Sequence, residues 1–196
     1  ALENLGGARG DCGIVHSSLS SLGYVEGGAD TVIHAFLEAL GPEGTLAMPT
    51  LCQRDKERRF ETWEISRSPS DVGRITEVFR LRRGSLRSDH ATHSVSAQGR
   101  LALEITRGHR TARGRPGPWG DAAFAADSPW QRLYDFRAAV VLLGVDFRVN
   151  TTVHYIEHRI VERALAAGSP AARTGMLERL HGWNRPGAWP GFDRLR

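Results

Sequence analysis

The chain has 196 residues, 40% of them hydrophobic and 24% charged, as is usual for one soluble globular domain with a sizeable core. No apolar run is long enough to cross a membrane and the first residues lack a signal pattern, so we expect a cytoplasmic protein without membrane contact. The net charge of +4 suits a small polyanion such as a nucleotide cofactor; without a recognition-helix, RRM or zinc-finger pattern, we expect no nucleic-acid partner.

The first fifty residues predict a strand, a loop, a helix and a second strand, which is the building unit of an α/β sheet. The first strand is CGIVHSSL (12–19) and the second is GTLAMPT (44–50). Between them, GGADTVIHAFLEALG has apolar residues at helical spacing, with Asp30 as a candidate N-cap and Gly41 as the stop. Cys12 and Cys52 have no CxxC spacing, which favours buried, reduced thiols.

Two contrasting segments follow. Residues 51–67 are charged with scattered aromatic residues, and we expect a long loop there, of the kind that often carries function. The next segment, SPSDVGRITEVFRLRRG, predicts a helix with Ser68 as its N-cap and Pro69 at its first position. Asp71 would be the acidic third residue of that helix, and Gly84 would end it.

The remaining segments alternate between extended and helical patterns. We expect extended segments and turns over 85–99, and short helices over 100–110 and 127–136. The most apolar run, AAVVLLGV (138–145), is short and rich in valine, which predicts a central buried strand. The Gly/Pro-rich stretch GRPGPWGD is a candidate hinge, and the chain from Ala166 onward is expected to be rich in loops.

The stretch VHSSLSSLG follows the first predicted strand and precedes a helix. Hydroxyls and backbone N–H groups in such a turn can hold a phosphate. The turn matches neither a Walker loop nor a dinucleotide fingerprint, so a plain strand-to-helix connection stays an alternative.

The stretch LRSDHATHS gathers Arg87, Ser88, His90, His93 and Ser94. Two histidines three residues apart could bind a metal. In an extended stretch, however, residues i and i+3 face opposite sides, so we expect no metal site here.

The stretch NTTVHYIEH predicts a helix capped by Asn150 or Thr151. His154, Glu157 and His158 would share one face of it, because positions three and four apart are neighbours on a helix. The pattern H-x-x-E-H is also a zinc-peptidase signature, with both histidines as ligands and the glutamate as base. Alternatively, His154 acts as a base beside a carboxylate, or the three residues are merely polar.

Taken together, the chain resembles the aminoglycoside 3-N-acetyltransferases, which are distinct from the GNAT acetyltransferases. The resemblance covers about residues 10–160 and is carried by five segments in order: VHSSLSSLGYVEGGADTVIHAFLEALGPEGTLAMPT, SPSDVGRITEVFR, LRSDHATHSVSAQG, DSPWQRLYDF and VVLLGVDFRVNTTVHYIEH. It implies a three-layer α/β/α sandwich with a mixed central sheet, and one acetyltransferase domain over residues 1–196. It also implies direct acetyl transfer from acetyl-CoA to an amine, without an acyl-enzyme.

The resemblance also implies roles for particular residues. The family's VHSSL-type loop lines the coenzyme site, and its RS-x-H segment lies close by. Its HYxE motif supplies the general base, which maps to His154, with Glu157 in the same motif. The implied coenzyme-binding residues are His16, Ser17, Ser18, Leu19, Ser20, Arg87, Ser88, His90, His93 and Ser94.

The chain also departs from the family pattern. Family members run longer, with a C-terminal segment that shapes the amine pocket, so we expect the domain to be incomplete or shortened at its C-terminus. Ala91 stands where family members usually carry proline. We expect an acidic acceptor pocket for a small cationic amine; its candidates are Glu57, Glu61, Glu64, Asp71, Asp146 and Asp193. The alternatives are a zinc peptidase and a coenzyme A-binding relative without acceptor activity, and we expect a monomer or a homodimer.

Overall fold

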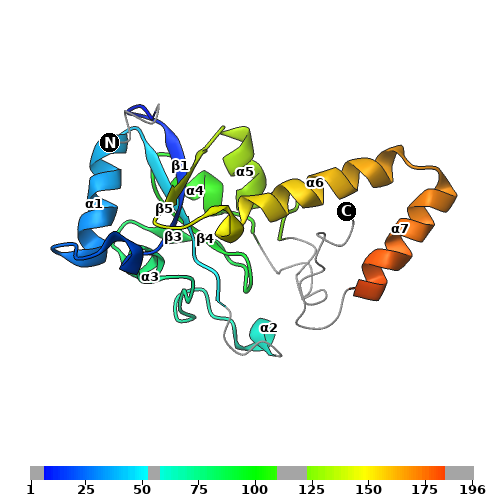
Figure 1. Cartoon of the computed structure of the whole chain (residues 1–196), viewed down its shortest axis with the longest axis horizontal. Coiled ribbons are helices and arrows are strands. Elements are labelled where there is room, and N and C mark those ends of the chain that lie inside the picture. The colour runs from blue at the N-terminus through cyan, green and yellow to red at the C-terminus, as the bar shows by residue number, and fades with distance from the viewer. Residues whose placement is uncertain (1–6, 53–57, 110–122, 184–196) are drawn as a thin grey trace.

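The computed structural model describes residues 7–52, 58–109 and 123–183 (Figure 1). A five-stranded sheet has the order β3-β4-β2-β1-β5. Its strands are β1 (Cys12–Ser17), β2 (Thr45–Pro49), β3 (Leu86–Arg87), β4 (Val95–Gly99) and β5 (Ala139–Leu143). β1 is parallel to both β2 and β5, whereas β4 is antiparallel to β2 and to β3. The sheet is therefore mixed, as predicted.

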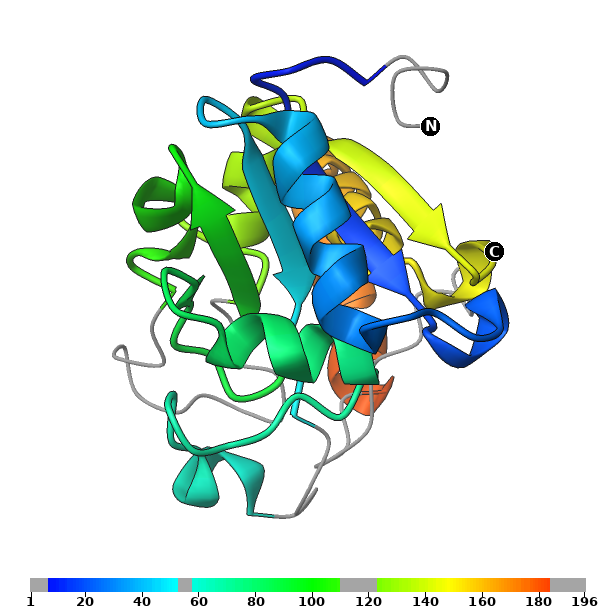
Figure 2. The same cartoon turned by 90° about the vertical axis from the view of Figure 1, so that its left-hand side faces the viewer.

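Helices cover both faces of this sheet. They are α1 (Gly28–Leu40), α2 (Arg59–Thr62), α3 (Arg74–Leu81), α4 (Ala102–Thr106), α5 (Pro129–Asp135), α6 (Thr152–Ala167) and α7 (Pro170–Trp183), with 3-10 turns η2 (Ser20–Leu22) and η4 (Phe147–Val149). Figure 2 shows α1 and α3 in front of the strands. No helix among the described residues is long and apolar enough to cross a membrane.

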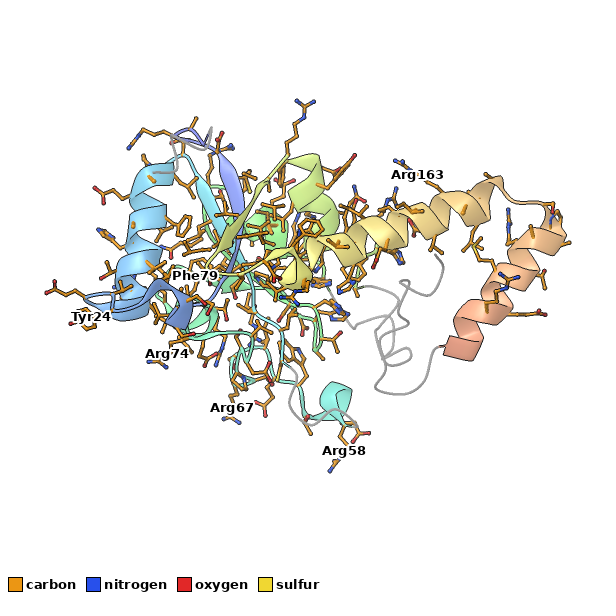
Figure 3. The ribbon with its side chains drawn as sticks, viewed as in Figure 1. Tyr24, Arg58, Arg67, Arg74, Phe79 and Arg163 are labelled. Atoms are coloured by element: carbon orange, nitrogen blue, oxygen red, sulfur yellow. The ribbon has the colours of Figure 1, made fainter. Side chains whose placement is uncertain are left out.

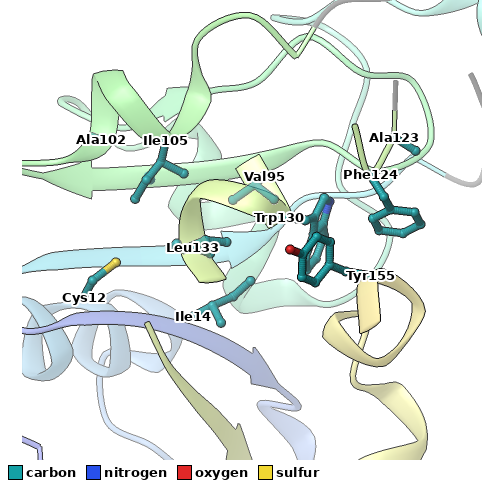
Figure 4. Close-up of a cluster of buried hydrophobic side chains, with 12 residues drawn as sticks. Cys12, Ile14, Val95, Ala102, Ile105, Ala123, Phe124, Trp130, Leu133 and Tyr155 are labelled. Atoms are coloured by element: carbon teal, nitrogen blue, oxygen red, sulfur yellow. The ribbon is translucent and has the colours of Figure 1, made fainter. Parts of the chain in front are cut away.

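Side chains alternate along β1 and so supply two hydrophobic cores. Val15 points into the core under α1 and α3, with Ile33, Phe36 and Phe79. Ile14 points into the opposite core, with Ile105, Phe124, Trp130, Leu133 and Tyr155 (Figure 4). The predicted three-layer α/β/α sandwich is therefore confirmed.

The parallel strands bring distant loops to one edge of the sheet. Ser17, at the end of β1, is paired with Leu143, at the end of β5. β2 ends at the same edge, and β4 starts there because Pro49 is paired with Val95. The serine-rich turn after β1 and the approach to α6 after β5 therefore meet where ligands commonly bind in open α/β sheets.

Several local predictions are confirmed. α1 ends at Gly41, whose φ of 70° places it in the left-handed region. α5 begins after Ser128, whose hydroxyl accepts a hydrogen bond from Gln131 N. Both cysteines are free, buried thiols. Asp30 is not the N-cap of α1, however. It lies in the first turn, because the left-handed Gly27 is the capping residue.

The prediction that α3 starts at Pro69 is wrong, because the helix starts at Arg74. Ser68 does not cap it; its hydroxyl instead accepts a hydrogen bond from Glu64 N at 2.9 Å. Gly73 has a φ of 137°, a conformation that breaks the helix on its N-terminal side. The predicted loop 51–67 contains the single turn α2, and residues 53–57 lie outside the described part of the chain.

The prediction that AAVVLLGV forms a central strand is also wrong. Among the described strands, β5 lies at an edge of the sheet and pairs only with β1. Ala139 and Val140 are accordingly exposed. A short apolar run indicates a strand that packs against a core, but it does not specify how many neighbours that strand has.

The tail from Ala166 onward was predicted to be rich in loops, but Pro170–Trp183 forms α7, which follows the predicted helix α6 away from the sheet (Figure 1). Residues 184–196 lie outside the described part of the chain. The start of α7 has a signal that composition obscured. Ser169 accepts a hydrogen bond from Ala172 N at 3.3 Å, and Pro170 occupies the first helical position. The candidate hinge GRPGPWGD falls within residues 110–122, outside the described residues.

Gly144 allows β5 to end against the serine-rich turn. Its φ is +66°, and a Cβ there would lie 2.9 Å from Ser21 Cβ and 3.0 Å from Ser18 O. Ser18 N also donates to Leu143 O at 2.9 Å. Both the backbone conformation and the close contact therefore require glycine.

Replacing Gly144 should test this packing. Gly108 has a similar φ of +71°, but its Cβ would meet only the end of Arg132, at 3.5 Å. We expect Gly108→Ala to lower the free energy of unfolding by about 1–2 kcal/mol, from left-handed strain alone. Gly144→Ala should cost about 2–5 kcal/mol, because the clash adds to the strain. Urea titrations of both variants measure the difference, and equal losses would contradict the packing argument.

His16 is a buried histidine within β1, and only 5% of it is exposed. Burial lowers its pKa to about 4, because the low-dielectric surroundings disfavour the charged imidazole. The unfolded chain takes up this proton near pH 6.5, whereas the folded chain does so only near pH 4. Acidification from pH 6.5 toward pH 4 therefore favours the unfolded state.

This difference predicts a pH-dependent stability. Between pH 7 and pH 5, His16 should reduce the free energy of unfolding by about 2 kcal/mol. His16→Gln should remove that part of the pH dependence, because glutamine does not titrate. The matched control is His34→Gln on the exposed side of α1. Urea titrations at both pH values measure how much the free energy of unfolding changes between pH 7 and pH 5. This change should be the same for the control and the unchanged protein; an equal change in His16→Gln would refute the assignment.

Candidate active site

A cleft of about 720 Å³ opens at the carboxyl edge of the sheet. Its walls come from the turn after β1, the end of β2, the start of α3 and the segment between β5 and α6. The lining residues are His16, Ser17, Ser18, Leu19, Ser20, Gly23, Pro49, Leu51, Val72, Gly73, Arg74, Thr76, Val145, Val149 and Thr151. The structure thus brings the five predicted residues of the serine-rich turn into one cleft.

Hydroxyl groups in this turn differ in their hydrogen bonding. Ser21 Oγ donates to Ser18 Oγ at 2.9 Å, and Ser18 Oγ lies 3.1 Å from Ser20 Oγ. His16 Nε2 and Ser17 Oγ are buried and have no hydrogen-bond partner among the described residues. Buried polar atoms in proteins are almost always paired. These two atoms therefore mark a place where a polar ligand or water completes the wall.

The start of α3 forms another wall of the cleft, which the sequence patterns did not predict. Gly73, Arg74 and Thr76 line the cleft there. The predicted helix start at Pro69 placed Arg74 in the second turn of the helix, whereas Arg74 is the first residue of α3. The signal that could have found it is Gly73, because an isolated glycine before a helical pattern often marks the true start.

Arg87 was expected to bind the coenzyme, but the structure gives its donors other partners. Its guanidinium donates to the backbone carbonyls of Thr50, Ser68 and Ile65, and to Ser94 Oγ at 3.2 Å. It also stacks over Trp63, with 4.5 Å from its central carbon to the ring centroid. Burial lowers its pKa to about 10. Arg87 therefore ties three loop segments together, and it is not part of the cleft lining.

Ser88 and the two predicted histidines are buried and are not among the residues that line the cleft. Contrary to the extended geometry assumed above, a turn brings the rings of His90 and His93 to 5.8 Å. His109, which the sequence analysis did not consider, stacks on His90 at 4.5 Å. Its Nδ1 lies 2.9 Å from Ser88 Oγ and its Nε2 lies 3.1 Å from the carbonyl of Ala123.

These contacts fix the state of the histidine cluster. A carbonyl only accepts, so His109 Nε2 carries the proton and Nδ1 accepts from Ser88. Burial holds the pKa of His109 well below its ordinary value, with His90 adding to the effect. His90 Nδ1 accepts from Thr92 N and His93 N. The described part of the chain contains no group of three or more His, Cys, Asp or Glu residues that could hold a metal.

The HYIEH segment forms the first turns of α6. His154 Nδ1 lies 3.0 Å from Glu157 Oε2, so it donates its proton to that carboxylate. The side chain of His154 is 37% exposed and that of Glu157 is 17% exposed. His158 is turned elsewhere, with its Nε2 3.2 Å from Glu162 Oε1. Thr151, one turn before His154, lines the cleft. His154 and Glu157 themselves are not among the lining residues; His154 follows Thr151 by one turn of α6.

The acidic candidates separate into two groups. Asp71 and Asp146 are exposed and each adjoins a cleft residue, Val72 and Val145 respectively. Asp146 also pairs with Arg148 at 2.5 Å. Glu64 pairs with Arg67 at 3.3 Å and is not among the lining residues. Glu61 pairs with Arg58. Glu57 and Asp193 lie outside the described residues.

Comparisons with known proteins agree with this architecture. The family model described as aminoglycoside 3-N-acetyltransferase matches residues 14–179. The SPbeta prophage-derived aminoglycoside N(3')-acetyltransferase-like protein YokD of Bacillus subtilis is 31% identical over 190 residues, which cover 86% of this chain and 66% of that protein. Aminoglycoside N(3)-acetyltransferase VII of Streptomyces paromomycinus is 31% identical over 173 residues, which cover 80% of this chain and 57% of that protein.

A solved structure is similar as well. The binary complex of AAC-IIIb with CoASH superposes with a TM-score of 0.70 at 28% identity, over 80% of this chain and 61% of that one. The chain thus spans between 57% and 66% of the lengths of these relatives. The match of the family model over most of the chain, with these relatives, means that the chain belongs to the aminoglycoside 3-N-acetyltransferase family.

Proposed function

We propose that the chain transfers an acetyl group from acetyl-CoA to an amine of an aminoglycoside or a similar small cationic amine. The observation that carries the proposal is the hydrogen-bonded pair of His154 and Glu157, which follows the cleft residue Thr151 on α6. Family membership supports the same chemistry. We further propose that it is a cytoplasmic enzyme that works as a monomer or a homodimer.

His154 has the arrangement of a general base. With its Nδ1–H directed to Glu157, the neutral ring has Nε2 as its proton-accepting nitrogen. An amine must lose a proton to attack a thioester, and an imidazole titrates in the range where it can accept that proton. The amine nitrogen bonds to the acetyl carbon, the carbon–sulfur bond breaks, and the thiolate leaves. Glu157 would hold the ring in place and stabilise the imidazolium that forms.

The residues of the cleft fit an acyl-coenzyme A. The group would supply the acetyl thioester, and its pantetheine and phosphates need hydrogen-bond donors along a long, narrow site. The serine-rich turn offers hydroxyls and backbone amides, and His16 Nε2 and Ser17 Oγ are buried without partners among the described residues. His16 would donate as a neutral imidazole, because burial lowers its pKa to about 4.

Two alternatives need a distinguishing experiment. A zinc peptidase would use His154 and His158 together, yet each bonds to a carboxylate of its own helix. A coenzyme A-binding relative without an acceptor site would bind acetyl-CoA but release no thiol. We propose a screen that measures coenzyme A release over a panel of aminoglycosides, simpler amines and neutral amines. Release of coenzyme A with a cationic amine supports the transferase. Binding of acetyl-CoA without release of coenzyme A, whichever amine is added, supports the relative without an acceptor site.

The roles of the two α6 histidines can be separated by substitution. His154→Ala should lower kcat by about 10²–10⁴, the usual range for loss of a general base, with acetyl-CoA affinity kept. His158→Ala should leave kcat within a few-fold, because His158 bonds to Glu162 and is not part of the His154–Glu157 pair. Chelators should have no effect. If both variants lost activity equally and zinc restored it, a metal site would replace the acid–base pair.

A second prediction concerns the acceptor. Asp71 adjoins the cleft residue Val72, whereas Glu64 is an exposed acid paired with Arg67. Asp71→Asn should raise KM for a polycationic amine several-fold and leave KM for acetyl-CoA unchanged, because only the acceptor loses an opposite charge. Glu64→Gln removes the same charge and should change neither constant. Steady-state kinetics with a neutral amine supplies the internal comparison, and an equal rise in its KM would argue against charge recognition.

A further inference from the structure

The segment between β2 and α3 leaves the cleft and returns to it. Leu51, at its beginning, and Val72, at its end, both line the cleft. Asp71 N donates to Leu51 O at 3.1 Å, so a backbone hydrogen bond joins the two ends into a neck at the cleft wall. Residues 63–70, which we call the return arm, lead directly into Asp71. The position of the return arm therefore determines the position of the neck.

The backbone of the return arm is held by side chains from outside it. Arg87 of β3 donates to the carbonyls of Ile65 and Ser68. Arg80 of α3 donates to the carbonyl of Ser66 at 3.0 Å. Two arginines on well-packed elements thus bind three successive points of the arm. These bonds go to main-chain carbonyls, so they do not depend on which side chains the arm carries.

Trp63 is the side chain with which the arm itself holds the fold. It is half-buried, whereas residues 64–67 are exposed. Its Nε1–H donates to Asp89 Oδ1 at 2.8 Å, and the guanidinium of Arg87 lies over its ring. An indole N–H only donates and a carboxylate only accepts, so this hydrogen bond specifies one orientation of the ring. The start of the return arm is therefore fixed by two contacts of one residue.

We propose that Trp63 is a positioning residue for the amine substrate. Its contacts with Arg87 and Asp89 set the return arm, and the arm in turn places Asp71 at the neck. Trp63 is not among the residues that line the cleft, so it acts through Asp71 and not by touching the amine. The inference rests on the proposed function, in which Asp71 attracts a polycationic acceptor.

Steady-state kinetics of Trp63→Phe tests the inference. Phenylalanine keeps a ring under Arg87 but loses the N–H that binds Asp89. KM for a polycationic amine should rise about three- to tenfold, as expected for one lost hydrogen bond, with kcat and KM for acetyl-CoA unchanged. In an Asp71→Asn background the same substitution should raise KM no further, because the acid through which Trp63 acts is gone. A merely structural role would not produce this dependence.

Matched variants separate the contact from its surroundings. Asp89→Ala should reproduce Trp63→Phe, whereas Asp89→Asn, which keeps an acceptor oxygen, should retain most of the affinity for the amine. The control is Asp135→Ala, which removes a carboxylate that accepts from Gln131 Nε2 at the same 2.8 Å but lies outside the cleft lining. It should leave all the kinetic constants unchanged.

Trypsin provides a measure of the return arm that needs no activity. The side chain of Arg67 points into solvent (Figure 3) and is 81% exposed. Cleavage after Arg67, followed by mass spectrometry, should be faster in Trp63→Phe than in the unchanged protein and in Asp135→Ala.

Three results would overturn the inference: an unchanged KM for the polycationic amine in Trp63→Phe, an equal rise of KM in the Asp71→Asn background, or an unchanged rate of cleavage after Arg67. If the unchanged protein acetylates no amine, the proposed function itself fails and this inference fails with it. Normal acetylation by the unchanged protein together with any of the three results refutes the role of Trp63 alone.

Discussion

The position of β1 between two parallel neighbours is the constraint on which the rest of the site depends. Because β2 and β5 run in the same direction as β1, all three strands end at one edge of the sheet. The turn that starts at Ser18 is fastened to the end of β5 by the bond from its N–H to Leu143 O. The same register puts the approach to α6 beside that turn. Without the parallel pairing, the serine-rich turn and the His154–Glu157 pair would lie at different ends of the molecule.

The hydrogen bonds of Arg87 and Ser88 hold together segments that follow or precede the strands. Arg87 joins the carbonyls of Thr50, Ser68 and Ile65, which belong to segments that have no strand pairing of their own. Beside it, Ser88 accepts from Val95 N and faces His109, so β4 is tied to a segment beyond α4. Ser88 thereby satisfies the buried N–H of Val95, and a buried backbone group left without a partner costs about 1–3 kcal/mol. The RS-x-H segment therefore connects loop segments that are far apart in the sequence.

What the sequence could predict depended on whether the interaction was local. The serine-rich turn and the spacing of His154 and Glu157 are local patterns; in the structure the turn lines the cleft, and His154 and Glu157 are hydrogen-bonded on one helix. The segment around Arg87 made it a candidate site residue. Its hydrogen-bond partners, however, lie up to 37 residues away in the sequence, and no local pattern specifies them. Arg74 was missed because three cap signals at Ser68, Pro69 and Asp71 outweighed one glycine. The edge position of β5 depends on strand order, which periodicity does not encode.

That edge position bears on how the protein behaves at high concentration. On the described part of the chain, the outer side of β5 carries backbone groups without a neighbouring strand, and Val140 is 42% exposed beside them. Such an edge is a template on which a strand from another polypeptide can add. Here the strand is only five residues long, and charged residues stand at both ends: Arg137 before it, and the ion pair of Asp146 with Arg148 after it. Charges that flank a short edge strand disfavour the addition of a second strand, so this edge has two of the features by which proteins limit aggregation through a sheet.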